Sequence, residues 1–290
     1  MTVLILILAH LVGDFYLQTD RMAASKQKYL IRHVLIHFVL YFCLLLVLYI
    51  WTLSVSRFLF QIALPSLILA LSHYAIDTLK IRTTRFISGS QIGQAYLFLS
   101  DQILHFTVIL LAGATFFYLP LSLFENFVAE MINQKRIPNV SLDDKILFCG
   151  IIIILATTFT GHLIRLLVGT IPEHLSLFEG KYTLTNSHGP LDQMKSQKPQ
   201  PSFEEEFNYV VNKKGDRSRG KIIGYVERLL VIILIVSSSY ASIGFIVAAK
   251  SIARFKQMDD RQFAEYFLLG TLTSIFFGMI YGFILRLVLF

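Results

Sequence analysis

The sequence predicts an all-α fold: a polytopic transmembrane helical bundle of about seven spans with one polar loop segment. Hydrophobic residues make up 55% of the 290 positions, and charged residues make up only 16%. This apolar share and the mean hydropathy of +0.63 both exceed what an ordinary soluble domain shows. Apolar runs also recur at about the 20-residue length that a helix needs to cross a bilayer.

The net charge of +7 does not indicate a nucleic-acid partner. The Lys and Arg residues are scattered among the segments between apolar runs and do not gather into one patch. The positive-inside rule explains this distribution, so we expect no nucleic acid among the partners. The two cysteines, Cys43 and Cys149, both lie inside apolar runs and do not predict a disulfide framework.

Seven apolar runs are the expected spans. They cover residues 3–18, 29–53, 58–79, 96–119, 146–171, 222–249 and 264–290. The first run lacks the basic start and the cleavage site of a signal peptide, so we expect a retained first helix. Residues 83–95 are polar and contain Gly89 and Gly93, which favours a loop or a surface-lying segment.

The spans divide the chain into five parts. We expect a four-helix module at 1–123, a short extramembrane segment at 124–145, a fifth span at 146–171, a polar linker or cap at 172–219, and a two-span module at 220–290. The charges of the linker nearly cancel and it contains several prolines, so it is not expected to form a core of its own.

The basic residues between the runs predict the orientation of the helices. One group flanks the turn after the first run and a second follows the third run: Arg21, Lys26, Lys28 and Arg32, then Lys80, Arg82 and Arg85. The positive-inside rule places both groups in the cytoplasm and the N-terminus outside. Counting seven spans then places a further basic group outside, against the rule: Lys250, Arg254, Lys256 and Arg261. The orientation of the last three spans therefore stays open.

Paired histidines and carboxylates interrupt the first four apolar runs. Residues 8–20 read LAHLVGDFYLQTD and residues 71–77 read LSHYAID, so in both a histidine precedes an aspartate by four positions. The second and fourth runs each carry a further pair with the same spacing. Residues four apart lie on one face of a helix. The eight side chains are His10, Asp14, His33, His37, His73, Asp77, Asp101 and His105.

All four pairs are expected at a similar depth. Two come just before a basic turn and two come shortly after one. At about 1.5 Å per residue they lie within a few helical turns of the same membrane face. Ionisable residues inside spans cost about 2.5 to 3.5 kcal/mol each, which argues against four idle pairs. Histidine and aspartate also serve as hydrogen-bonding groups between helices, which is the alternative. We expect one polar site inside the first four helices, toward the cytoplasmic leaflet.

The residue types indicate a divalent transition metal, because imidazole nitrogen and carboxylate oxygen are ligands of zinc, manganese and iron. Eight candidate ligands exceed what one tetrahedral ion needs, so we expect either two ions or one ion with supporting groups. The candidate catalytic groups are Asp14, Asp77, Asp101 and Lys80. The candidate substrate contacts are Gln18, Gln102, Arg165 and Arg228.

Several of these motifs resemble a known family. LAHLVGDFYLQTDRMAASK, HVLIH, HYAIDTLK and DQILH resemble the N-terminal module of a bacterial membrane family catalogued as domain of unknown function 3307. GYVERLL, IGFIVAAKSIARF and AEYFLLGTL resemble the C-terminal part of its longer members. The resemblance implies a multi-pass protein of the bacterial inner membrane and carries no activity. The His-x3-Asp and Asp-x3-His pairs are also similar in spacing to those of zinc-dependent phospholipase C.

Three functions fit the sequence. The first is a metal-dependent hydrolase of a lipid or lipid-linked phosphoester, in which metal-bound water is the nucleophile. The second is a transporter of an ion or an anionic lipid that uses the same His and Asp cluster, with the repeated hairpins as internal repeats. The third is a non-catalytic membrane scaffold or sensor that recruits a soluble partner through residues 172–219.

Overall fold

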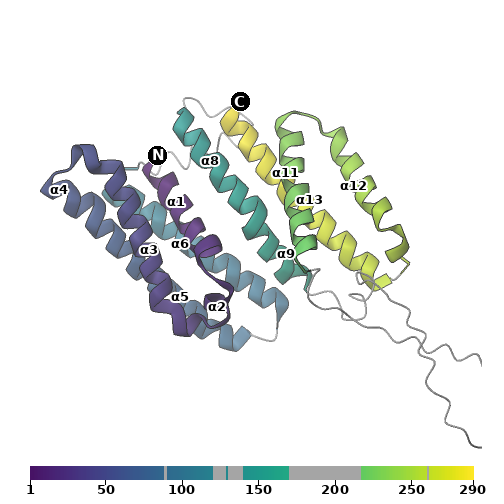
Figure 1. Ribbon diagram of the computed structural model, residues 1–290, viewed down its shortest axis with the longest axis horizontal. Coiled ribbons are helices and arrows are strands. Elements are labelled where there is room, and N and C mark those ends of the chain that lie inside the picture. Colours follow the sequence, from purple (N-terminus) through teal and green to yellow (C-terminus); the bar gives the residue numbers. More distant parts are fainter. Residues whose placement is uncertain (88–89, 120–128, 130–139, 170–216, 260) are drawn as a thin grey trace, which may run out of the picture.

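The computed structural model describes residues 1–87, 90–119, 129, 140–169, 217–259 and 261–290. Every regular element in these ranges is a helix, which confirms the predicted all-α class. Figure 1 shows the helices packed side by side, with α1 to α6 at one side of the molecule and α8 to α13 at the other.

The N-terminal group of helices comes from residues 2–116. Its elements are α1 (Thr2–Val12), a π-helical turn (Gly13–Leu17), α2 (Asp20–Ala24), α3 (Lys26–Tyr49), a 3-10 turn (Ile50–Thr52), α4 (Val55–Arg57), a second π-helical segment (Phe58–Ala63), α5 (Leu64–Ile87) and α6 (Gln91–Phe116).

The C-terminal group comes from residues 142–289. Its elements are α8 (Leu142–Ile154), a π-helical turn (Leu155–Phe159), α9 (Thr160–Val168), α11 (Arg217–Val236), α12 (Ala241–Ala253), a 3-10 turn (Phe255–Gln257) and α13 (Arg261–Leu289).

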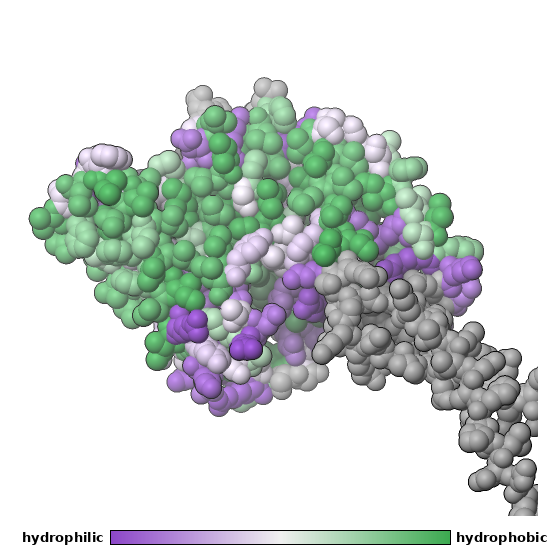
Figure 2. Space-filling view, viewed as in Figure 1, coloured by the Kyte–Doolittle hydropathy of each residue, from purple (hydrophilic) through white to green (hydrophobic). Residues whose placement is uncertain are grey.

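Five helices in the described part of the chain are long and apolar enough to cross a membrane. They are Lys26–Thr52, Val55–Ile87, Gln91–Phe116, Leu142–Val168 and Phe263–Leu289. Two shorter apolar helices, Thr2–Leu17 and Ala241–Ala253, accompany them, so the expected total of about seven spans is not confirmed. Large apolar side chains are exposed along the helices, and Figure 2 shows them covering most of the visible face. Such a surface indicates membrane association.

The bundle has two chemically different ends. At one end the N-terminal amino group lies 2.9 Å from Asp144, and Lys145 donates to the backbone oxygen of Leu289 at 3.0 Å. Both termini therefore lie at this end, as Figure 1 also shows. At the other end Arg85 donates to Gln27 at 3.3 Å, which joins the start of α3 to the end of α5. We call this second end the basic end.

Of the two alternatives predicted for residues 83–95, a loop or a surface-lying segment, the loop is wrong. Helix α5 continues to Ile87 and α6 begins at Gln91. Ser90 explains the early start, because its hydroxyl oxygen accepts a hydrogen bond from the Gly93 N–H at 3.1 Å and caps the helix. The polar residues described on either side of residues 88–89 therefore lie at helix ends.

The predicted single span over residues 222–249 is also wrong, because the chain turns between α11 and α12. Three consecutive serines follow Val236, and Ser238 has a φ of 60°. Serine side chains compete for backbone hydrogen bonds and favour turns over helix interiors. Helix α12 then returns toward the start of α11, where Lys250 lies 2.7 Å from Glu227.

This additional turn removes the conflict in the predicted orientation. One more reversal of the chain brings Lys250 to the end at which α11 begins. The preceding helix α9 ends at the basic end, because Gly169 lies against the side chain of Gln91 at the start of α6. The basic residues between α12 and α13 thus share an end with the two earlier basic groups.

Two predicted segments lie mostly outside the described residues. The expected short extramembrane segment at 124–145 is described only at residue 129 and from residue 140 onward. The expected linker at 172–219 is described only from Arg217, where α11 begins.

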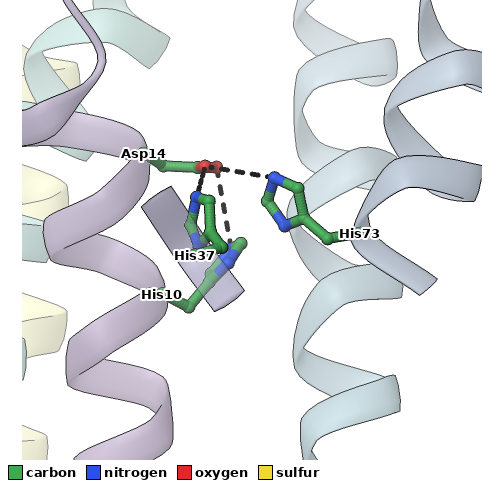
Figure 3. A group of neighbouring side chains, drawn as sticks. All are labelled: His10, Asp14, His37 and His73. Atoms are coloured by element: carbon green, nitrogen blue, oxygen red, sulfur yellow. Dashed lines mark hydrogen bonds and ion pairs between the residues drawn. The ribbon is translucent and has the colours of Figure 1, made fainter. Parts of the chain in front are cut away.

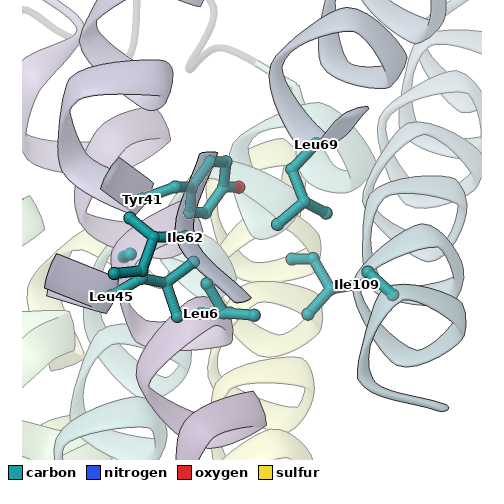
Figure 4. Packing of buried hydrophobic residues seen from close by; sticks show 8 residues of the cluster. Leu6, Tyr41, Leu45, Ile62, Leu69 and Ile109 are labelled. Carbon is teal, nitrogen blue, oxygen red and sulfur yellow. The ribbon is translucent and has the colours of Figure 1, made fainter. Parts of the chain in front are cut away.

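Apolar layers hold each group of helices together. In the N-terminal group, a buried cluster connects α1, α3, α5 and α6, and Figure 4 shows its side chains converging on the centre of the bundle. It includes Leu6, Tyr41, Leu45, Ile62, Leu69 and Ile109. In the C-terminal group, Gly278 and Gly282 let α13 pack closely on α11, because a Cβ at either position would lie 3.0 Å or less from Val231 or Ile235.

Candidate metal centre

Four histidines form a ring across the N-terminal bundle, one from each of α1, α3, α5 and α6. Neighbouring imidazole centroids are 3.9 to 5.4 Å apart around the ring. The members of this histidine ring are His10, His37, His73 and His105. Each is at most 4% exposed. Antiparallel helices with one inward histidine each are sufficient to build this layer.

A second layer lies one helical turn closer to the basic end. It follows from the four-residue spacing, since each histidine of the ring has its partner one turn along the same helix. This acidic layer contains Asp14, His33, Asp77 and Asp101. The structure thus brings all eight sequence-predicted ligands into one cluster, which we call the His/Asp cluster.

Asp14 lies at the centre of the cluster and belongs to the π-helical turn Gly13–Leu17. The Asp14 Oδ1 atom is 3.1 Å from Nε2 of His37 and 3.2 Å from Nε2 of His33. Its Oδ2 atom is 3.7 Å from Nε2 of His10. Figure 3 shows the carboxylate pointing at the imidazoles from three helices, with His73 on the far side. π-helical turns of this kind often occur at functional sites.

Gly13 allows His37 to approach this turn. A Cβ atom on Gly13 would lie 2.3 Å from Cε1 of His37 and 2.7 Å from its Nε2. The imidazole therefore packs directly on the α1 backbone, and any larger residue would displace it.

Asp77 and Asp101 each divide their two oxygens between a lysine and the imidazoles. Asp77 accepts from Lys26 at 2.5 Å through Oδ1, while Oδ2 lies 3.6 Å from Nε2 of His73. Asp101 accepts from Lys80 at 2.6 Å through Oδ2, while Oδ1 lies 3.7 Å from Nε2 of His105. In both residues one oxygen is held in an ion pair and the other faces the histidine ring.

Several atoms at the centre of the cluster are buried without a hydrogen-bond partner among the described residues. They are both ring nitrogens of His10, Nε2 of His105, Oδ2 of Asp77 and Oδ1 of Asp101. Buried polar atoms are normally satisfied, and leaving them unpaired is unfavourable. A cation held between these atoms would satisfy the two carboxylate oxygens and one ring nitrogen of each histidine, while the other nitrogen of His10 carries the ring proton.

The distances fit a transition metal. Ligand atoms around a tetrahedral zinc ion lie about 3.3 Å apart, because each bond to nitrogen or oxygen is about 2.0 to 2.1 Å long. Three groups in the cluster have ligand atoms that all lie within 4.8 Å of one another. The groups are His10, Asp14, His37 and His73; His33, His73 and Asp77; and Asp77, Asp101 and His105. His73 and Asp77 each belong to two groups, and the Asp77 carboxylate could bridge two neighbouring ions.

The remaining candidate residues do not all join the cluster. Gln102 is buried in it and donates to Asp14 at 2.9 Å and to Asp101 at 3.3 Å. Gln18 does not continue the face of His10 and Asp14, because the helix ends at Leu17 and the Gln18 backbone is extended.

The two candidate arginines belong to the C-terminal group of helices. Arg165 is exposed on α9. Arg228 is buried on α11, where its guanidinium donates to the backbone oxygens of Ala156 and Thr157. Its side chain therefore lies inside the protein and not at a lipid head-group surface.

Lys26 belongs to the site, although its sequence position was used above only to predict the orientation of the helices in the membrane. It precedes His33 by seven residues, two helical turns on the same face of α3. That spacing is the signal that would have identified it. Its side chain is 20% exposed, so it connects the buried Asp77 to the surface at the basic end.

Gly13→Ala is expected to destabilise the protein by about 1 to 3 kcal/mol through overpacking against His37. In an ordinary helix the same change would stabilise the folded protein by about 1 kcal/mol. A loss of stability would therefore indicate close packing of His37 on Gly13. Chemical unfolding in detergent measures the difference. Gly150→Ala is the control, because its Cβ would meet only Leu8 at 3.7 Å. Equal stabilities for the two variants would contradict the close packing of His37 on α1.

Comparison with known proteins identifies the part of the chain that holds this site. Residues 2–133 match the model of a family described as protein of unknown function (DUF3307). This range contains all eight residues of the His/Asp cluster as well as Lys26, Lys80 and Gln102. No curated protein and no solved structure matches the chain. The match covers somewhat less than half of the chain, and over these residues the chain is similar to the DUF3307 family.

Proposed function

We propose that this protein is an integral membrane metalloenzyme that hydrolyses a phosphoester of a lipid or lipid-linked substrate. The observation that carries the proposal is the overlap of the three ligand groups at His73 and Asp77. A carboxylate such as Asp77 could bridge two divalent ions through its two oxygens, whereas the neutral imidazole of His73 would bind one of them through Nε2. Zinc, manganese and iron are the candidates, because the donor set is imidazole and carboxylate.

The charge of the cluster favours an anionic substrate. Three carboxylates and two lysine ammonium groups leave it with one net negative charge when the imidazoles are neutral, as metal binding requires. Two divalent ions would make the loaded site strongly positive. A phosphoester would neutralise part of that charge, whereas a neutral ester or amide would not.

Bound ions would supply a water molecule of lowered pKa and would stabilise the attacking and leaving oxygens. The chain's own groups have separate tasks. Asp14 and Gln102 form a hydrogen bond inside the cluster that fixes the carboxylate, and Lys80 is a cationic group 22% exposed at the basic end. An open hollow lined by residues 24–28 borders Lys26, the other lysine that reaches from the surface to an aspartate.

A hydrolase fits this arrangement better than a transporter. On the side away from the basic end, each histidine of the ring has a buried residue of the hydrophobic core one turn away on the same helix. These residues are Leu6, Tyr41, Leu69 and Ile109. They fill the bundle centre in Figure 4, and the Tyr41 hydroxyl is the one polar group that these four side chains carry. The cluster is therefore approached from one end only, as a substrate site is.

We place the protein in the bacterial inner membrane with its basic end in the cytoplasm. The basic groups that follow α1, α5 and α12 support this orientation, because positively charged connections are retained on the cytoplasmic side. The lipid substrate would then come from the cytoplasmic leaflet.

The proposal is tested by turnover of lipid phosphoesters with purified full-length protein. Phosphatidic acid, phosphatidylglycerol and an isoprenoid diphosphate are offered in mixed micelles, and released phosphate or head group is measured by mass spectrometry. We expect turnover that chelation abolishes and that added zinc or manganese restores. A metal-loaded protein that hydrolyses none of these while moving the metal ion across liposomes would favour transport and contradict the hydrolase.

A further inference from the structure

A second polar site lies between α11, α12 and α13, which contribute nothing to the His/Asp cluster. These helices enclose a small cavity of about 10 Å³. Its polar lining consists of Glu227, Arg228, Lys250, Thr271 and Ser274. Space of this size accommodates a single small ligand, a water molecule or a monatomic ion.

Arg228 brings a buried positive charge to this cavity. Its side chain is 3% exposed and donates to the backbone oxygens of Ala156 and Thr157 and, at 3.1 Å, to the hydroxyl of Ser274. Within the described ranges, no carboxylate forms an ion pair with it, since Glu227 is paired with Lys250 at 2.7 Å. A buried charge without an ionic partner is unfavourable and indicates a missing one.

Thr271 provides the second, independent observation. Thr271 is 5% exposed, and its hydroxyl oxygen has no hydrogen-bond partner in the described part of the chain. Other helical threonines donate to a carbonyl one turn earlier, as Thr273 does to Leu269 at 2.7 Å. Thr271 instead borders the cavity. Ser274, one turn further along α13, accepts from Arg228 and so keeps its own proton for another acceptor.

We propose that this cavity binds one small monovalent anion of the size of chloride. The two cations that line it outnumber the single carboxylate, so the site has one net positive charge. The Thr271 and Ser274 hydroxyls are donors, and an anion between them would both accept their protons and compensate Arg228. Glu227 also borders the cavity, but its charge is already neutralised by Lys250. Water would satisfy the hydroxyls and would leave the charge uncompensated.

The test measures chloride binding to full-length protein in detergent. Protein in sodium gluconate is titrated with sodium chloride at constant ionic strength, while thermal unfolding is followed and bound radiolabelled chloride is measured by equilibrium dialysis. We expect a saturable rise of a few degrees in the unfolding midpoint and about one chloride per chain. Thr271→Val is expected to weaken chloride binding at least tenfold. Thr273→Val, two residues away on the same helix, should bind as wild type does.

Two results would overturn the proposal. The first is a wild-type protein with no saturable chloride effect and no retained chloride, which means that the cavity holds only water. The second is full chloride retention by Thr271→Val. Should that variant fail to fold, Ser274→Ala tests the same site, and unchanged chloride retention in it contradicts the proposal equally.

Discussion

Asp77→Asn is expected to remove most of the bound metal and to abolish lipid hydrolysis. Asp77 belongs to two of the three ligand groups, and its Oδ2 atom is buried without a hydrogen-bond partner among the described residues. An asparagine has nearly the same shape but no charge, so the change removes the interaction with metal without creating a cavity. It also leaves the ammonium of Lys26 without the carboxylate that it contacts at 2.5 Å.

The loss of that ion pair is expected to cost stability as well. Removing one partner from a buried pair typically destabilises by about 3 to 5 kcal/mol. Elemental analysis and the lipid assay measure the functional effect, and chemical unfolding measures the stability. Asp144→Asn is the matched control, because Asp144 pairs with the N-terminal amino group at the opposite end of the bundle. Equal metal content in the two variants would remove Asp77 from the site.

Lys26→Met is expected to destabilise the metal-free protein and to increase the stabilisation that added metal provides. Without Lys26, the buried Asp77 carboxylate loses its cationic partner. A divalent ion at the other carboxylate oxygen would replace that partner. Repulsion between two unit charges several ångströms apart is about 3 kcal/mol at an effective dielectric constant of about 20, so the native lysine weakens metal binding.

An opposing effect exists, because Lys26 also holds the carboxylate in position. Loss of a group that orients a ligand typically costs 10 to 100-fold in metal affinity, or about 1.4 to 2.8 kcal/mol. The charge effect is larger, so we expect a net gain in the metal-induced shift of the unfolding midpoint. Lys28→Met is the control, since Lys28 is exposed and lies over the Tyr29 ring. A smaller shift in Lys26→Met than in Lys28→Met would show that orientation dominates.

Much of the N-terminal module follows from short-range patterns in the sequence. The four-residue spacing of His10 and Asp14, repeated at His73 and Asp77, places each pair on one helix face, and the basic turns place the pairs at similar depth. Neither inference needs knowledge of how the helices pack. The structure brings the four pairs into one cluster, and their role as metal ligands stays a prediction.

The features that could not be predicted depend on packing or on local backbone changes. The π-helical turn at Gly13–Leu17 changes the helix register just before Gln18, which an ideal helix would keep on the ligand face. The contact between Lys26 and Asp77 joins residues 51 positions apart. The turn at Ser238 lies within a run whose hydropathy is continuous, so a window that counts apolar residues passes over it.

Arg228 illustrates a different limit of sequence reasoning. A cationic residue near the start of an apolar run suggests a contact with lipid head groups. In the structure its guanidinium instead donates to the backbone oxygens of Ala156 and Thr157 in the π-helical turn Leu155–Phe159. The π-helical turn in one helix offers backbone carbonyls, and the guanidinium on another helix donates to them. A sequence pattern within either helix does not reveal this interaction between the two.

The central claim is that the His/Asp cluster binds divalent metal, and elemental analysis of purified protein tests it most directly. Protein from cells grown with zinc, manganese and iron is compared with a His10→Ala, His73→Ala double variant that folds to the same helical content. We predict one to two transition-metal ions per wild-type chain and at least a tenfold loss in the double variant. Wild-type protein without stoichiometric metal, and unable to take it up after purification, would contradict the claim.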